Sequence, residues 1–215
     1  MIKSYKELTI KKYQEIRNIL EEDGGELNIQ ANIIACLSGM DVEDVMNLSL
    51  TRYNELAQNT AFLMDKPNVT GKVPDKLIIN GKECIITTNV NKLTAGQYID
   101  YQTLIAMPNQ EKYLANILAC FIVPKNHDYS NGYDTDEIAR WLSENMSILD
   151  AMNICFFFRK KYLNSIKITL TYLELQMRMM KMRAKTKELK EKMVELNDKL
   201  KEYRKALENV GAGWQ

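Results

Sequence analysis

The chain has 215 residues, 46% of them hydrophobic and 27% charged, with a formal net charge of +1. These values predict one or two folded domains and exclude a disordered chain. The charge is unevenly distributed: residues 1–158 contain 14 Lys and Arg against 21 Asp and Glu, and residues 159–215 contain 15 against 7. An acidic body with a basic C-terminal arm can attract its own copies head to tail, or offer the arm to an acidic partner.

The cysteines and the apolar segments indicate the compartment. Cys36, Cys84, Cys120 and Cys155 form no CxxC pair and no Cys–His cluster, which excludes a zinc site of the usual kind. Three of them lie in apolar surroundings, where reduced cysteine behaves as a small hydrophobic residue. The first residues are charged, and no apolar run is long enough to span a bilayer. We therefore expect a soluble intracellular protein with no membrane association.

The first 66 residues predict a helical subdomain. Thr9 is a suitable N-cap for the first helix, Gly24-Gly25 breaks it, and Gly39 ends the second. The spacing of apolar residues predicts helices over residues 10–22 and 29–37, a short helix after Asp41, and a helix over 50–64.

Residues 67–91 predict a connector followed by one β-hairpin. Asn80-Gly81 separates two β-branched runs, and both residue types tolerate the positive φ angles of a type I′ turn. Because an isolated hairpin is marginally stable in water, we expect it to pack on helices or to join the sheet of a neighbouring subunit.

Residues 92–165 predict a second helical subdomain. Thr94 begins one helix, Pro108 separates it from the next, and a loop over residues 123–133 follows. Asp134 precedes Glu137 by three residues, the spacing of a capping box. The expected helices cover residues 94–107, 109–122 and 135–145, and a further apolar helix starts at Ser147.

The sequence contains no recognisable set of catalytic residues. His127 is the only histidine, and it lies in a loop beside Asp128 with no cysteine or serine motif to supply a nucleophile. Acidic groups such as Asp41, Glu43 and Asp44 are explained by the favourable position of negative charge at a helix N-terminus. Glycine-rich phosphate loops and metalloprotease motifs do not occur. We therefore expect a protein that is not an enzyme and that uses no cofactor or metal.

The C-terminal region carries the strongest pattern. Apolar residues recur every three or four positions from Ile168 to Val210, interrupted only by Thr186, and this repeat is typical of a helix that winds around another helix. It predicts a long, basic, coiled-coil-like helix over residues 166–215 that projects from the body and binds a partner. The expected contact residues are Leu175, Met179, Met182, Leu189, Met193, Leu196, Leu200, Tyr203 and Leu207.

A second apolar row lies between Ile166 and Ala184, on a face that we expect to adjoin the first. Its members are Ile166, Leu170, Leu173, Met177, Met180 and Ala184. Two apolar faces suggest packing on the protein's own body and on something else. The alternative is that the tail folds back and both rows are ordinary core, since periodicity does not reveal which chain supplies the facing helix.

Nucleic acid is the alternative partner. The basic stretch comprises Arg178, Lys181, Arg183, Lys185, Lys187, Lys190 and Lys192. Basic helices that enter a groove occur ahead of coiled coils. Here methionines interrupt the charge and Glu188, Glu191 and Glu195 follow, which is more typical of the solvated flanks of a coiled coil. Any contact with nucleic acid would be a non-specific interaction with phosphates.

Four segments together resemble a known group of proteins: YKELTIKKYQEI (5–16), IACLSGM (34–40), LTRYNEL (50–56) and KLTAGQYID (92–100). They are similar to small helical proteins of tailed bacteriophages, namely tail-assembly-chaperone-like and accessory virion proteins of crAss-like and other Bacteroidetes-infecting phages. The likeness covers residues 5–160, and the basic tail has no counterpart in it. It implies a non-enzymatic role in building the virion, in the host cytoplasm or within the particle.

The prediction from the whole sequence is a mainly α protein: a multi-helix body with one β-hairpin and a long C-terminal helix. Its expected partners are phage structural proteins and further copies of itself.

Overall fold

The computed structural model describes residues 1–22, 25–125, 127, 134–183 and 187–212. It divides into two compact units, residues 1–155 and residues 156–215. The described chain is mainly helical and includes a small three-stranded antiparallel sheet, so the predicted fold class is confirmed at that level. The finer division of the first unit into subdomains 1–66 and 92–165, joined by residues 67–91, stays a prediction.

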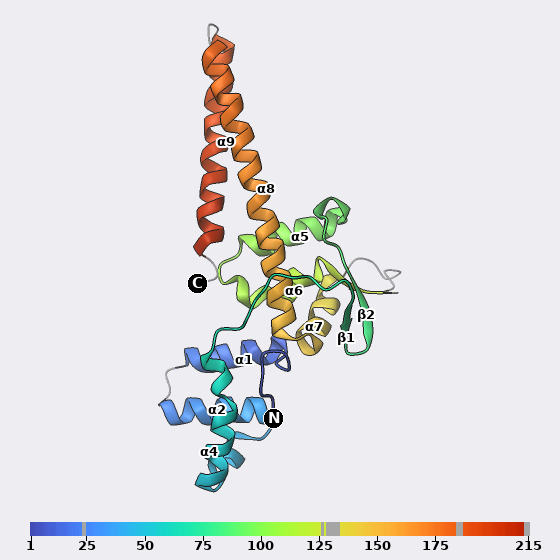
Figure 1. Ribbon diagram of the computed structural model, residues 1–215, viewed down its shortest axis with the longest axis vertical. Helices are drawn as coiled ribbons and strands as arrows, with labels where there is room; N and C mark the ends of the chain where they lie inside the picture. Colours follow the sequence, from blue (N-terminus) through green and yellow to red (C-terminus); the bar gives the residue numbers. More distant parts are fainter. Residues whose placement is uncertain (23–24, 126, 128–133, 184–186, 213–215) are drawn as a thin grey trace. The chain divides into compact units, whose positions relative to one another are not determined.

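The helices follow the predicted order through residue 155 (Figure 1). The N-terminal α-helices are α1 (Ile10–Glu21), α2 (Glu26–Ser38), α3 (Val42–Met46) and α4 (Leu50–Asn59), with the 3-10 helix η1 at Ala61–Met64. Then come η2 (Val90–Lys92), α5 (Ala95–Ala106), η3 (Gln110–Tyr113), α6 (Leu114–Ala119) and α7 (Thr135–Asn145). The last two are α8 (Ile148–Arg183) and α9 (Lys187–Ala212).

Side-chain caps fix several of these helix starts. Thr9 Oγ1 accepts from the Lys12 N–H at 3.3 Å and begins α1. Thr94 Oγ1 accepts from the Gln97 N–H, and the Gln97 side chain accepts from the Thr94 N–H, which completes a capping box. Asp134 caps α7 by accepting from the Asp136 N–H at 2.8 Å. The reciprocal capping box therefore occurs at α5, although the sequence suggested one at α7.

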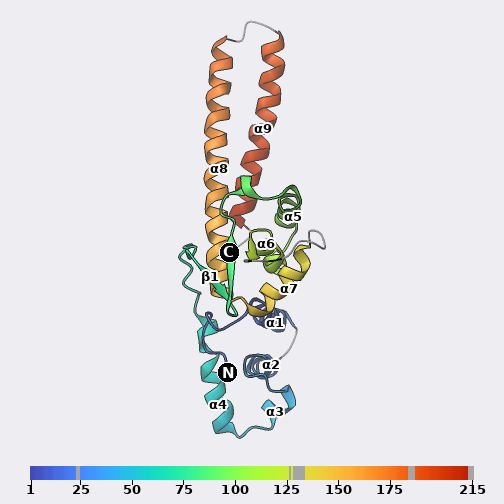
Figure 2. The same cartoon turned by 90° about the vertical axis from the view of Figure 1, so that its right-hand side faces the viewer.

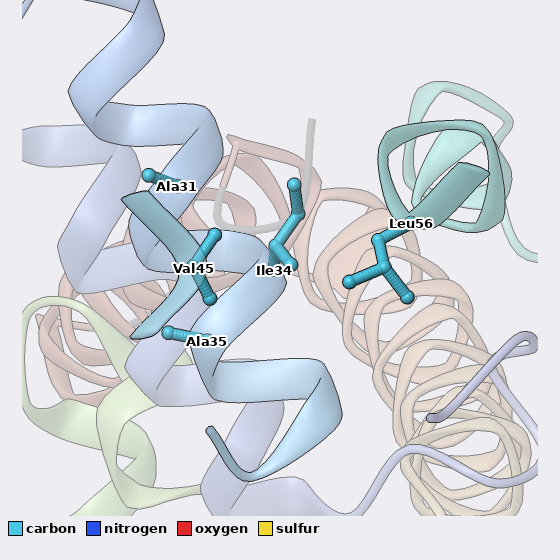
Figure 3. Packing of buried hydrophobic residues seen from close by; sticks show 5 residues of the cluster. All are labelled: Ala31, Ile34, Ala35, Val45 and Leu56. Atoms are coloured by element: carbon cyan, nitrogen blue, oxygen red, sulfur yellow. The ribbon is translucent and has the colours of Figure 1, made fainter. Parts of the chain in front are cut away.

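Helices α2, α3 and α4 enclose the first part of the core. The side chains of Ala31, Ile34, Ala35, Val45 and Leu56 form this cluster, and Ile34 and Leu56 are seen between α2 and α4 in Figure 3. Small residues on α2 allow the short α3 to approach closely, while the larger aliphatic side chains fill the space between the helices.

The sheet contains the predicted hairpin and one additional strand. Strands β1 (Leu77–Ile79) and β2 (Lys82–Ile86) are joined by Asn80 and Gly81, with φ angles of 46° and 74°. Positive φ at both positions confirms the predicted turn. Strand β3 (Ile122–Pro124) pairs with the other side of β2, so the predicted loop from residue 123 begins as a strand. Within its own chain the hairpin thus gains a third strand.

The predicted helix over residues 109–122 is shorter than expected. Asn109 has a φ of 57°, η3 follows, and α6 ends at Ala119. Phe121 is then fully buried and contacts Tyr101 edge to face, with ring centroids 4.8 Å apart. The apolar run from Leu114 therefore divides between a buried helix and a strand whose first residue, Ile122, is buried, and periodicity alone cannot distinguish the two.

Backbone hydrogen bonds join the N-terminal segment to the start of α8. The Ile10 N–H donates to the Met146 carbonyl at 3.1 Å, and the Ile148 N–H donates to the Leu8 carbonyl at 2.7 Å. The side chains of all four residues are buried. The first turns of α8 consequently belong to the core of residues 1–155.

The C-terminal region forms two helices, so the prediction of one helix over residues 166–215 is wrong. Arg204 Nη2 lies 3.1 Å from Glu174 Oε1. In one continuous helix these residues would be about 45 Å apart, at about 1.5 Å per residue. Instead α9 runs back beside α8 (Figures 1 and 2). The alternative that the tail folds back agrees with this arrangement, but its second part, that both apolar rows are core, does not, because Ile168, Tyr172 and Leu175 are exposed.

Candidate functional site

A row of four side chains on α8 is the most extensive exposed apolar feature among the described residues of the second unit. Ile168, Tyr172, Leu175 and Met179 are 71%, 57%, 55% and 43% exposed. We call this row the α8 stripe. Its spacing of four, three and four residues keeps it on one side of the helix over about 17 Å. Leu175 and Met179 are among the nine predicted contact residues, and Ile168 and Tyr172 precede them in the same periodic pattern.

The second apolar row occupies the other side of α8. At about 100° per residue, the row of Ile166, Leu170, Leu173 and Met177 is centred roughly 160° from the α8 stripe. The two faces are therefore nearly opposite, and the prediction that they adjoin is wrong. Ile166 is buried and the other three are half-buried. The row that begins at Ile166 accounts for intramolecular packing, while the α8 stripe remains accessible.

Polar side chains beside the α8 stripe form hydrogen bonds within α8 itself. Thr171 Oγ1 donates to the Lys167 carbonyl at 2.9 Å, and the Gln176 side chain donates to the Tyr172 hydroxyl. These bonds satisfy polar groups without help from another molecule, so the stripe presents mainly carbon atoms to solvent. An apolar surface of this kind suits another apolar surface rather than a polar ligand.

Helix α9 presents its predicted contact residues differently. Leu196 is half-buried, Leu200 is 4% exposed and Tyr203 is 37% exposed. Arg204, one turn after Leu200, forms the ion pair with Glu174 of α8. Leu200 is thus already covered within the chain and offers no surface to a partner.

The other predicted residues of the C-terminal region lie outside the described side chains. This holds for the expected contact residues Met182, Leu189, Met193 and Leu207. It also holds for the basic residues Arg178, Lys181, Arg183, Lys185, Lys187 and Lys190, whereas Lys192 is described and exposed.

An open groove of about 370 Å³ lies among α1, η3, α6 and α7 of the first unit. Its described lining includes no histidine or cysteine, and its charges have both signs. Lys11 Nζ lies 3.7 Å from Glu144 Oε1, and the Asn116 side chain donates to Asp136 at 3.5 Å. The groove therefore has a mixed lining in which several polar groups already bond to one another.

Elsewhere the described residues offer little reactive chemistry. His127 lies after β3, and its backbone N–H donates to the Pro124 carbonyl at 3.0 Å. Burial raises the pKa of the Cys120 thiol to about 12, with a further contribution from the negative charge of Asp100, so this thiol is protonated at neutral pH. Within the described ranges, no three His, Cys, Asp or Glu side chains gather as ligands for a metal ion.

Two further exposed apolar surfaces were not predicted. Ile78 and Ile85 lie on the outer face of the sheet, where the alternation along β1 and β2 was a usable signal. Val42, Met46 and Leu50 project from α3 and the start of α4. Their four-residue spacing was visible in the sequence, but the short α3 gave no basis for deciding which side faced the core.

Comparison with protein-family models, with curated proteins and with solved structures gives no match. Among the described residues, no helix has both the length and the apolar character required to cross a membrane.

Proposed function

We propose that the protein is a non-enzymatic interaction protein that binds another protein through the α8 stripe. The observation that carries this proposal is the exposure of four large apolar side chains in helical register on α8. The opposite face of α8 is buried or half-buried within its own chain, whereas the α8 stripe is exposed to water. Binding of a partner that covers the α8 stripe would therefore lower the free energy.

The expected energetics define how large the partner surface must be. Full burial of each stripe side chain contributes about 1.5–3 kcal/mol. That value applies to a fully exposed side chain, and the four stripe side chains are already partly buried at 71%, 57%, 55% and 43% exposure, so covering the rest supplies roughly 3–7 kcal/mol. Association costs an estimated 4–15 kcal/mol in lost translational and rotational freedom. The α8 stripe alone would therefore support weak binding. A stable complex requires contacts beyond it.

The biological setting that we propose is bacteriophage assembly. It rests on the resemblance of the segments around Tyr5, Ile34, Leu50 and Lys92 to tail-assembly-chaperone-like and accessory virion proteins. In that setting the protein self-associates or docks on a larger phage structural protein, in the host cytoplasm during assembly or within the virion.

The charge distribution favours one second candidate, a nucleic-acid-binding packaging accessory. Residues 156–215 contain 15 Lys and Arg against 7 Asp and Glu. Binding through these cations would weaken steeply with salt because it releases counterions from the nucleic acid. Titration of labelled DNA at increasing salt measures this directly, and binding without a salt slope would contradict a phosphate-binding role.

The proposed function is tested by placing charge on the α8 stripe. In the variant Ile168→Glu/Leu175→Glu, two exposed positions become carboxylates, and glutamate preserves helix propensity. Capture of partners from phage-infected lysate, read by mass spectrometry, should be lost because a carboxylate is costly to bury against an apolar surface. Unchanged circular dichroism would show that the fold persists.

A matched control is Thr169→Glu/Thr171→Glu, which adds the same charge to the same helix beside the stripe, where Thr171 is exposed and Thr169 is partly exposed. This control should retain the partners. Equal capture by the stripe variant and the wild type would contradict the proposed function.

A further inference from the structure

Exposed apolar side chains on α3 and at the start of α4 lie close in the chain to exposed acidic residues. Val42, Met46 and Leu50 are 42%, 58% and 75% exposed. Val42 and Met46 are one turn apart on α3, and Leu50 follows four residues later. Asp41, Glu43 and Asp44 are exposed in the same segment. We call these six residues the α3–α4 patch.

Glu43 and Asp44 lie in the first turn of α3, where negative charge is favourable, but no cation of the described chain pairs with the carboxylates of the α3–α4 patch. Asp41 makes no side-chain cap hydrogen bond, and α3 has only five residues. Among the described residues, none of the three carboxylates forms an ion pair, unlike Glu83, which lies 2.9 Å from Lys125, or Glu21, which lies 4.0 Å from Arg17. The patch thus joins an apolar surface to uncompensated negative charge.

The two apolar surfaces belong to units of opposite charge. The patch lies in residues 1–155, which carry 14 Lys and Arg against 21 Asp and Glu, and the α8 stripe lies in the unit with a balance of +8. Pairing two stripes would bring two basic units together, which costs electrostatic energy. Pairing stripe with patch covers both apolar surfaces and brings together units of opposite net charge.

From this complementarity we infer that the α8 stripe of one copy docks on the α3–α4 patch of a second copy. The inference rests on the proposed function, because it names the partner of the same stripe. The contact is heterologous, since each copy contributes a different surface. Each copy retains one free stripe or patch, so association continues into a ring or an open chain unless it is blocked.

The test uses one variant that disrupts the α8 stripe, one that disrupts the α3–α4 patch, and an equimolar mixture of the two. The stripe variant is Ile168→Glu/Leu175→Glu, and the patch variant is Glu43→Lys/Met46→Lys. Sedimentation velocity of the full chain over a concentration series should show oligomers beyond the dimer for the wild type. Each variant alone should lose at least about tenfold in association constant. An equimolar mixture should form a 1:1 dimer and stop there, because it contains one intact stripe and one intact patch.

Leu20→Lys/Glu22→Lys is the matched control, because it makes the same type of change at exposed positions of α1 and just after it. This control should associate like the wild type. Raising the salt concentration should weaken wild-type association, since exposed opposite charges are screened.

The outcomes separate the two proposals. A patch variant that associates normally, while the stripe variant does not, overturns the stripe-to-patch contact and leaves the proposed function standing. A stripe variant that both associates and captures partners normally overturns the proposed function as well. A mixture that remains monomeric, or a wild type that is monomeric at every concentration, overturns the inference.

Discussion

At the scale of single residues, the turn of the hairpin depends on two positions with positive φ. Asn80 and Gly81 have φ angles of 46° and 74°, and nothing lies within 4 Å of a Cβ placed on Gly81. Any cost of substituting Gly81 therefore comes from the backbone conformation and not from a steric clash. The Asn80 side chain also donates to Asn145 Oδ1 at 2.8 Å, which connects the turn to α7.

Gly81→Ala is expected to lower the free energy of unfolding by about 1 kcal/mol, because the left-handed region is unfavourable for residues with a Cβ. Gly81→Asn should cost less, since asparagine tolerates that region. Urea denaturation of both variants measures the difference. Equal stability of the alanine variant and the wild type would contradict the role of the positive φ.

The Cys120 thiol provides a second residue-scale prediction. It is fully buried and its pKa is raised to about 12, so its reactive thiolate is scarce at pH 8. Iodoacetamide should alkylate Cys120 slowly in the folded protein and rapidly in urea, as read by peptide mass spectrometry. Because the thiol of the unfolded chain ionises with its ordinary pKa of 9.0, the free energy of unfolding should also fall as the pH rises from there toward 12. Rapid alkylation in the native state would contradict the burial of Cys120.

At the scale of elements, short apolar segments were the hardest to assign. Strand β3 has only three residues and is separated from the end of α6 by two residues, so the apolar sequence resembles a continuation of the helix. Its identity depends on pairing with β2, where Ile85 is opposite Val123. Long-range pairing of this kind leaves no local periodicity.

The reversal between α8 and α9 was also hidden in the sequence. The apolar repeat continues on both sides of the break, because each helix has an apolar face whether it is extended or folded back. The same repeat therefore fits one projecting helix and two antiparallel helices.

The reversal can be tested by zero-length cross-linking. In Arg204→Lys, a carbodiimide should couple Glu174 to the new lysine, since the native groups lie 3.1 Å apart. The linked peptides should occur in the monomer band of a gel. A single helix would separate these residues by about 45 Å and give no such product. Replacement of Glu174 by Gln in the same background is the control and should abolish the coupling.

At the scale of the whole molecule, the first unit should fold without the second. Its core includes the start of α8, where Ile148, Ala151 and Ile154 are fully buried. A fragment of residues 1–165 is expected to unfold cooperatively in urea with a helical circular dichroism spectrum. A fragment of residues 1–145 lacks the backbone pairing of Leu8 and Ile10 with Ile148 and Met146, and it should be markedly less stable. An unfolded 1–165 fragment would contradict the independence of this unit.

The sequence by itself determined the elements that depend on local chemistry. The N-cap at Thr9, the Asn80-Gly81 turn and the bounds of α7 follow from hydrogen bonds and φ preferences within a few residues. It also determined the opposite charges of the two ends of the chain and the apolar stripe on α8.

Only the tertiary structure decided which apolar faces are covered. Periodicity marks the row of Ile166 and the row of Ile168 alike, yet Ile166 is buried and Ile168 is exposed. Leu200 continues the same repeat and is buried. The hydrophobic effect is non-directional, so the apolar residues of a helix face do not specify which surface will cover them. The α8 stripe and the α3–α4 patch are candidate binding surfaces because the tertiary structure leaves their side chains exposed.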